Sequence, residues 1–248
     1  ALAEHIAGSE TTFAALMNQY AQQLGMKSSH FVNSTGLPHA DHYSTARDLA
    51  TLSYAIIRDY PEYYKYYSMK KFVYNGIPQY NRNKLLWRDK SVDGLKTGHT
   101  DSAGYCLISS AKRDKMRLIS VVLGDKSEEA RATSSKALLS YGFRFFETRK
   151  LYSAGQVLKK VRIWKGEQET LPLGLTRDLY VTFRRGNYKN LSATVNVVKK
   201  IIAPARVSAS ILEVGGSKDI EAALDRAIEN DDSIGGIIQC TISPVPAG

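Results

Sequence analysis

The stretch VDGLKTGHTDSAGY, residues 92–105, decides the fold of the first part of the chain. It leads into an apolar run over residues 105–111, and a polar turn over residues 112–115 separates this run from another over residues 117–123. Two such runs joined by a short polar turn predict an antiparallel β-hairpin. We therefore expect Lys96 to lie beside an edge of an antiparallel sheet.

Helical patterns precede this sheet. Apolar residues recur every three or four positions from Phe13 to Leu24, and Gly25 follows as an end signal, so we predict an amphipathic helix facing the core. Thr45 and Asp48 form a capping box that opens a second helix. Its apolar face consists of Leu49, Leu52 and Ile56, and it ends before Pro61.

A third helix is expected over residues 126–147, packed back on the sheet. The side chains expected to face inward are Ala130, Ala137, Leu138, Tyr141 and Phe145. Beyond this helix the pattern turns strand-like, in residues 157–164, 179–183 and 191–198.

Length and composition permit one large domain or two small ones, because 248 residues with 43% hydrophobic content can bury a core. No run of eighteen apolar residues occurs and the first residues lack a secretory signal pattern, so we expect the chain as written neither to span a membrane nor to export itself.

Cys106 and Cys240 are too far apart to predict a disulfide framework or a metal site. Cys106, in an apolar strand, is expected to be a small buried side chain.

The net charge of +10 is unevenly distributed: residues 1–148 carry +5, residues 149–204 carry +9 and residues 205–248 carry −4. In the basic segment the charges alternate with apolar residues, which is typical of strands with a solvated face. Contact with anionic envelope polymers or lipid headgroups is the alternative. We expect no nucleic-acid partner, because no nucleic-acid motif accompanies the charge.

Lys96-Thr97-Gly98 is one of three short motifs that together form a penicilloyl-type serine acyl-transfer site. Three longer stretches surround or include it: YNRNKLLW (80–87), VDGLKTGHTDSAGY (92–105) and SYGFRFF (140–146). Together they closely resemble the low-molecular-mass D-alanyl-D-alanine carboxypeptidases, the penicillin-binding proteins 5 and 6, over about residues 1–204. The resemblance implies an α/β fold, with an incomplete β-lactamase/DD-peptidase-like domain of antiparallel sheet and packed helices over 1–148 and a small β-rich domain over 149–204.

The resemblance also implies the roles of individual residues. Lys96 and Thr97 would bind the terminal carboxylate of a peptide ending in D-Ala-D-Ala, and the backbone N–H of His99 would bind the oxyanion. These roles suit a cation, a hydroxyl and a preorganised amide, and Gly98 would let the substrate backbone lie close. Arg82 and Arg131, the latter expected ahead of the third helix, match family positions and would lie near the cleft. The alternative is that both are ordinary surface arginines.

The chain departs from the family in the other two motifs of the site, Ser-x-x-Lys and Ser-x-Asn. Ser68 with Lys71 and Ser109 with Lys112 match Ser-x-x-Lys by spacing, but neither serine is expected at a helix start, where a lysine one turn on could take its proton. No Ser-x-Asn occurs. We therefore expect the nucleophile upstream of residue 1 and predict no turnover by the isolated chain.

By resemblance, the activity is serine-type D-Ala-D-Ala carboxypeptidase chemistry in peptidoglycan maturation. The implied partners are stem peptides ending in D-Ala-D-Ala and β-lactams, with peripheral membrane contact, no metal or other cofactor, and a periplasmic or envelope location. The main rival is a non-catalytic peptidoglycan-binding protein of the envelope. A β-lactamase shares only Lys-Thr-Gly and ranks last.

Three segments leave alternatives open. The loop over residues 30–43 holds three histidines and Asp41, but their spacing does not favour a metal site. The tyrosines between Glu62 and Tyr67 suit packing better than a stacking platform for a sugar or a base. Residues 205–248 depart from the family and look like a fragment of chorismate synthase joined to the chain, or else a divergent end of the β-rich domain.

Overall fold

The computed structural model describes residues 1–248 except 166, 176, 191, 197–200, 203–210 and 216–248. The chain divides into two compact units, one reaching from Ala1 to Phe143 and the other beginning at Arg144. Helices and strands are mixed in the first unit, whereas strands dominate the second. This confirms the predicted α/β class with a β-rich C-terminal part.

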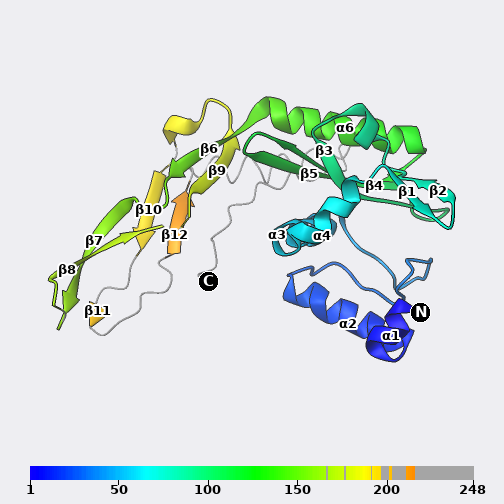
Figure 1. Cartoon of the computed structure of the whole chain (residues 1–248), viewed down its shortest axis with the longest axis horizontal. Helices are drawn as coiled ribbons and strands as arrows, with labels where there is room; N and C mark the ends of the chain where they lie inside the picture. The colour runs from blue at the N-terminus through cyan, green and yellow to red at the C-terminus, as the bar shows by residue number, and fades with distance from the viewer. Residues whose placement is uncertain (166, 176, 191, 197–200, 203–210, 216–248) are drawn as a thin grey trace. The chain divides into compact units, whose positions relative to one another are not determined.

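The first unit begins with helices and then forms a hairpin and the central sheet (Figure 1). Its elements are α1 (Leu2–Ala7), α2 (Glu10–Gln23), α3 (Ala46–Asp59), α4 (Pro61–Tyr64), the 3₁₀ turn η1 (Lys65–Ser68), β1 (Lys71–Tyr74), β2 (Ile77–Tyr80), α5 (Leu85–Arg88), β3 (Val92–Thr100), β4 (Gly104–Arg113), β5 (Met116–Asp125) and α6 (Glu128–Phe145).

The central sheet has the strand order β3-β4-β5, and both pairs are antiparallel. The predicted hairpin of β4 and β5 is therefore confirmed, and β3, with Lys96, is an edge strand as expected. Successive residues of β5 point to opposite faces. Ile119 and Val121 pack against Ala50 of α3, whereas the Ser120 hydroxyl contacts that of Ser135 in α6 at 2.5 Å. Helices thus cover both faces of the sheet.

The start of α3 follows the predicted cap. The Thr45 hydroxyl accepts a hydrogen bond from the backbone N–H of Asp48 at 3.2 Å. The Asp48 carboxylate is buried and accepts hydrogen bonds from the N–H of Ser28 and the hydroxyl of Ser29. Asp48 therefore ties the helix to the preceding loop, a role that the capping box alone does not predict.

The predicted inward face of α6 is largely wrong. Tyr141 is 45% exposed, Phe145 is 37% exposed and Ala137 is also exposed. The buried side consists of Arg131, Ala132, Ser135, Leu138, Leu139, Gly142 and Phe143. A Cβ atom on Gly142 would lie 2.5 Å from Cδ1 of Leu118 in β5, so a small residue is needed where the helix approaches the sheet. At Gly142 the close approach of β5, and not hydrophobicity, decides which residue of α6 is buried.

Three smaller expectations also need correction. Tyr20, assigned to the core face of α2, is 63% exposed, because the small residues Ala14 and Ala21 form the buried contacts of that helix. Arg131 lies within α6, as the predicted range 126–147 implies, and not ahead of the helix as the family match suggested. Cys106 is only partly buried, and its thiol lies 3.4 Å from the carbonyl of Ala103.

The second unit is built from short, mostly antiparallel strand pairs. Its strands pair as β6 with β9, β8 with β7, β7 with β11, and β10 with β12. Its elements are β6 (Phe146–Tyr152), β7 (Val157–Trp164), β8 (Thr170–Gly174), β9 (Leu179–Arg184), the 3₁₀ turn η2 (Tyr188–Asn190), β10 (Ser192–Asn196), β11 (Ile201–Ile202) and β12 (Ile211–Gly215). The three predicted strands of this part correspond to β7, β9 and β10, whereas β6 replaces the expected end of the third helix.

Candidate functional site

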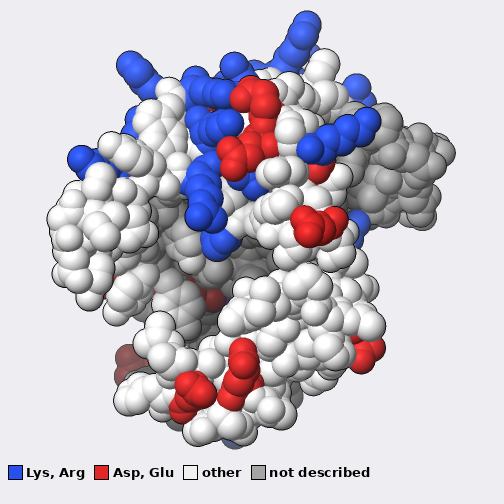
Figure 2. All heavy atoms as spheres, turned by 90° about the vertical axis from the view of Figure 1, so that its right-hand side faces the viewer, with Lys and Arg blue, Asp and Glu red and all other residues white. Residues whose placement is uncertain are grey.

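A cleft of about 1100 Å³ lies along β3. One wall is formed by β3 and β4, and the loop over residues 35–42 contributes to the other. Figure 2 shows this hollow near the middle of the face, with Lys and Arg side chains along its upper rim. The six residues that the sequence predicts for the site all line this cleft, namely Arg82, Lys96, Thr97, Gly98, His99 and Arg131.

Lys96 is exposed within the cleft, and its ammonium group donates a hydrogen bond to the carbonyl of Thr97. Partial burial among the cleft walls lowers the pKa of Lys96, and the positive charges of Arg82 and Arg131 lower it further. Among the described residues, neither Lys96 nor Arg82 forms an ion pair. Arg131 pairs with Glu128, which also lines the cleft, at 3.8 Å, so the cleft charges without a carboxylate partner in the described chain are those of Lys96 and Arg82.

Arg82 is held in place by the two asparagines beside it. The Asn81 side chain donates to the carbonyls of Tyr67 and Met69, at 3.2 and 3.1 Å, and accepts from the N–H of Asn83. Asn83 is 1% exposed, and its amide donates to the carbonyl of Gly94 in β3 at 3.0 Å. The Asn-Arg-Asn sequence thus fixes a backbone turn from which an exposed arginine projects at the cleft.

Arg131 is 3% exposed and acts on the backbone of the sheet. Its Nη1 donates to the carbonyls of Gly98 and Cys106, at 3.0 and 3.4 Å. A trans peptide unit is planar with its C=O and N–H pointing opposite ways, so the N–H of His99 points away from Arg131. The ring of His99 lies on the ring of Tyr105, with 4.0 Å between centroids, which helps to fix this end of β3.

A cluster that sequence reasoning missed holds the beginning of β3. Arg117 donates two hydrogen bonds to the Asp93 carboxylate, both of 2.8 Å, and the Tyr64 hydroxyl donates to the same carboxylate at 2.8 Å. Burial raises the pKa of the Tyr64 phenol. A Cβ atom on Gly94 would lie 2.5 Å from the Tyr64 hydroxyl, so this position requires glycine. Asp93 and Gly94, shortly before Lys96, were the available sequence signal. A charged residue within a strand needs a partner for its charge, and a glycine there indicates that another group lies close to the backbone.

Neither accidental Ser-x-x-Lys match has nucleophile geometry. Ser109 is 0% exposed in the middle of β4. Ser68 ends the short turn η1 instead of beginning a helix, and its hydroxyl donates to the carbonyl of Lys65 at 2.7 Å. Neither serine lines the cleft.

The histidine loop contributes to the wall of the cleft. In the part of the chain that the structure describes, no group of three or more His, Cys, Asp or Glu residues is placed to hold a metal ion. Burial lowers the pKa of His42, and the nearby His30 and His39 lower it further. These surroundings disfavour the protonated form of His42.

Among the described residues, no helix is both long and apolar enough to cross a lipid bilayer.

Comparison with known proteins gives two matches along the chain. Residues 1–127 match the family described as D-alanyl-D-alanine carboxypeptidase. Residues 146–222 match the domain described as the C-terminal domain of penicillin-binding protein 5. The second match extends past residue 205, and the resemblance of residues 205–248 to chorismate synthase receives no support; most of that segment lies outside the described residues.

Individual relatives agree with these matches. The D-alanyl-D-alanine carboxypeptidase DacA of Escherichia coli K12 is 46% identical over 195 residues, which cover 78% of this chain and 48% of the relative. The crystal structure of penicillin-binding protein 5 from Haemophilus influenzae is 40% identical, with a TM-score of 0.75, covering 88% of this chain and 64% of that one. Penicillin-binding protein D2 of Listeria monocytogenes, solved with ampicillin bound, is 36% identical with a TM-score of 0.54, covering 57% of this chain and 59% of that one. The chain spans about half the length of the curated relatives it matches.

Proposed function

Because the chain belongs to the D-alanyl-D-alanine carboxypeptidase family, we propose that its cleft binds peptides ending in D-Ala-D-Ala for serine-type carboxypeptidase chemistry. The bacterial relatives include an ampicillin-bound protein, and we extend β-lactam binding to the complete site of this chain. The natural ligand is then the stem peptide of peptidoglycan, in the cell envelope. Peripheral membrane contact through the basic second unit, with no nucleic-acid partner, belongs to the same proposal.

The positive charge of Lys96 carries this proposal, because no carboxylate of the described chain pairs with it, whereas Arg131 is paired with Glu128. Burial lowers the pKa of Lys96, and Arg82 and Arg131 lower it further; a bound carboxylate would offset the repulsion from the two arginines. The Thr97 hydroxyl, beside Lys96 on the same edge strand, can donate to the second oxygen of the carboxylate. A Cβ atom on Gly98 would make only an ordinary 3.7 Å contact with Cys106, so packing within the described chain does not require this glycine. A ligand backbone lying close to β3 accounts for it.

In the complete reaction, an activated serine attacks the penultimate D-Ala carbonyl, the terminal D-Ala leaves, and water releases the acyl group. We assign the oxyanion to the N–H of His99, which points away from the carbonyl held by Arg131. Arg131 is then a positioning residue that orients this peptide unit, and Arg82 adds positive charge for the substrate carboxylate. The serine and its lysine base would have to come from outside these 248 residues, so the chain alone is proposed to bind without turnover.

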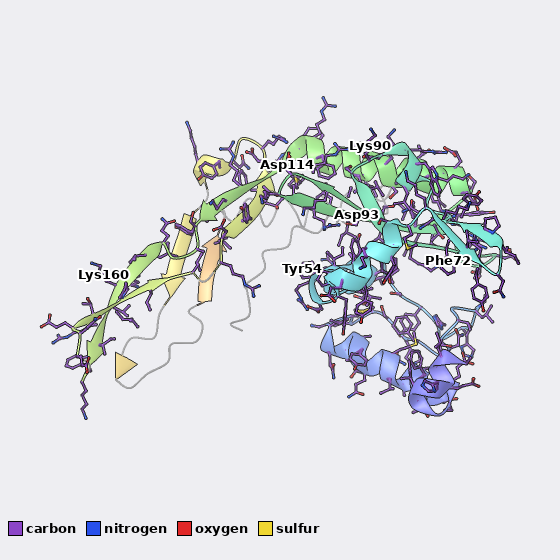
Figure 3. The ribbon with its side chains drawn as sticks, in the orientation of Figure 1. Tyr54, Phe72, Lys90, Asp93, Asp114 and Lys160 are labelled. Atoms are coloured by element: carbon purple, nitrogen blue, oxygen red, sulfur yellow. The ribbon has the colours of Figure 1, made fainter. Side chains whose placement is uncertain are left out.

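Calorimetric titration with an acetylated tripeptide ending in D-Ala-D-Ala tests the proposal. We expect Lys96→Ala to weaken binding about tenfold or more, because the substrate carboxylate loses a charged hydrogen-bond donor. Lys90→Ala is the matched control, since Lys90 is an exposed lysine that does not line the cleft (Figure 3). Equal affinity of the Lys96→Ala variant and the unmodified chain would contradict the proposed clamp.

A non-catalytic peptidoglycan-binding protein is the second candidate. The observation in its favour is that neither Ser68 nor Ser109 has nucleophile geometry, whereas the cleft that binds the peptide is formed. Peptide binding without acylation, even after an upstream segment with Ser-x-x-Lys is supplied, would favour this candidate over the enzyme.

A further inference from the structure

The hairpin of β1 and β2 exposes an unusual number of large apolar side chains. Phe72 is 56% exposed, Tyr74 61%, Ile77 63% and Tyr80 64%. Figure 3 labels Phe72 on this hairpin. Exposed apolar groups gathered in this way mark interaction surfaces more often than single exposed residues do.

The hairpin holds these side chains in a fixed arrangement. Phe72 pairs with Gln79 and Tyr74 pairs with Ile77, so these four residues share one face. Asn75 and Gly76 close the turn with φ values of 48° and 75°, the conformation of a type I′ turn. At the other end, the Asn81 N–H donates to the carbonyl of Lys70 at 2.9 Å. A fixed aromatic surface loses little conformational entropy on binding.

Positive charge accompanies the hairpin, and Lys71 lies with Tyr80 on the face opposite to Phe72 and Tyr74. From Lys65 to Arg88 the sequence contains six Lys and Arg residues and no Asp or Glu. The Lys71 ammonium lies 5.9 Å from the ring centroid of Tyr80, and that of Lys70 lies 5.8 Å from the ring centroid of Trp87. The hairpin therefore suits a ligand that combines faces able to stack on aromatic rings with negative charge.

The hairpin leads to the cleft through its other face, because Tyr80, which pairs with Lys71, is two residues from Arg82, which lines the cleft. We propose that the hairpin binds the amino-sugar strand of peptidoglycan while the peptide attached to that strand occupies the Lys96 cleft. Sugar rings present C–H faces that stack on aromatic rings. The lactyl group that carries the bound peptide is an amide, and the carboxylates are those of neighbouring sugars that have lost their peptides. This inference rests on the proposed function for the identity of the polymer. An anionic bilayer would satisfy the same charge, but it would not connect the hairpin with the cleft.

The test uses the full chain with three separate ligands: peptide-free glycan strands, the acetylated D-Ala-D-Ala tripeptide, and vesicles containing phosphatidylglycerol. The variant Phe72→Ser/Tyr74→Ser removes the two rings of one hairpin face. Tyr20→Ser is the matched control, because Tyr20 is a 63% exposed tyrosine on α2 that does not line the cleft. Circular dichroism and thermal unfolding of each variant verify that the fold is retained.

We expect the hairpin variant to lose glycan affinity about tenfold and to keep tripeptide affinity within about twofold. Tyr20→Ser should change neither. Glycan binding that is equal in the hairpin variant and the unmodified chain, or that falls equally in Tyr20→Ser, overturns the inference. So does hairpin-dependent binding of the vesicles with no binding of the glycan. Loss of tripeptide binding by Lys96→Ala reports on the proposed function alone, because the glycan strands carry no D-Ala-D-Ala.

Discussion

Lys96 combines exposure to solvent with a pKa below the ordinary lysine value of 10.5. Its protonated form binds a carboxylate, so peptide affinity should fall as the pH rises through this lowered pKa. This loss of affinity should begin at a lower pH than it would for a lysine with the ordinary pKa. Titrations of the D-Ala-D-Ala tripeptide at several pH values between 7 and about 10.5 measure it.

Lys96→Arg provides the control for this pH dependence, because a guanidinium remains protonated throughout the range. We expect the variant to bind with an affinity that does not change with pH. An equal alkaline loss in the variant and the unmodified chain would assign the titration to another group. The sign for stability is the opposite: the unfolded chain binds the proton more tightly at Lys96, so this group makes the fold more stable as the pH rises from its lowered pKa to 10.5.

Asp93 should matter for stability because three hydrogen bonds from Arg117 and Tyr64 end on its carboxylate. Asp93→Asn leaves the partly buried Arg117 without its anion and should reduce the free energy of unfolding by roughly 1–3 kcal/mol. Urea unfolding followed by Trp87 fluorescence in a Trp164→Phe background isolates the first unit, since the chain has two tryptophans. Asp59→Asn is the control: Asp59 pairs with Arg58 on an exposed helix end and should show no measurable loss. Equal effects of both changes would show that the hydrogen bonds among Asp93, Arg117 and Tyr64 do not stabilise β3.

At the scale of single residues, the Lys-Thr-Gly motif and the family resemblance predicted which residues line the cleft. Arg82, Lys96, Thr97, Gly98, His99 and Arg131 all line it, while their roles remain predictions. The sequence did not predict that Arg131 is buried beneath the strand, because a charged residue near a helix start usually reaches solvent. Tyr64 and Asp93 are 29 positions apart, and no local pattern relates them.

At the scale of elements, the contact of α6 with β5 depends on Gly142. Gly142→Val would place side-chain carbons against Leu118 and should destabilise the first unit by about 1–3 kcal/mol through overpacking. Adding Leu118→Ala should recover part of this loss, because the two positions share one space and their effects are not additive. Urea unfolding of the single and double variants measures the coupling. Purely additive losses would contradict direct contact between α6 and β5 at this point.

Elements with a local sequence signal were predicted well. The Thr45 cap and the hairpin of β4 and β5 rest on neighbouring residues, and the structure confirms both. The buried face of α6 was predicted wrongly because the choice between Gly142 and Tyr141 depends on the distance to a distant strand. The first two residues of β6, Phe146 and Glu147, were assigned to the end of that helix for a similar reason: the pairing of β6 with β9 joins residues more than 25 positions apart.

At the scale of the whole molecule, two sequence matches correspond to the two kinds of structure seen, an α/β part and a strand-rich part. The boundaries predicted at residues 148 and 204 remain predictions. The family was recognised from motifs spread over residues 80–146, whereas the β-rich part was expected mainly from the alternation of charged and apolar residues. Alternation reveals strands but not their partners, and so the pairing of β11 with β7 had no signal in the sequence.

The most direct test of the central claim is incubation with a fluorescent penicillin followed by denaturing electrophoresis and intact mass. It compares the 248-residue chain with the same chain extended upstream by a segment carrying Ser-x-x-Lys and Ser-x-Asn. We predict that only the extended chain gains the mass of one penicilloyl group, because the cleft of this chain provides binding groups without a nucleophile. Labelling of the 248-residue chain itself would contradict this account and require a nucleophile among its own serines.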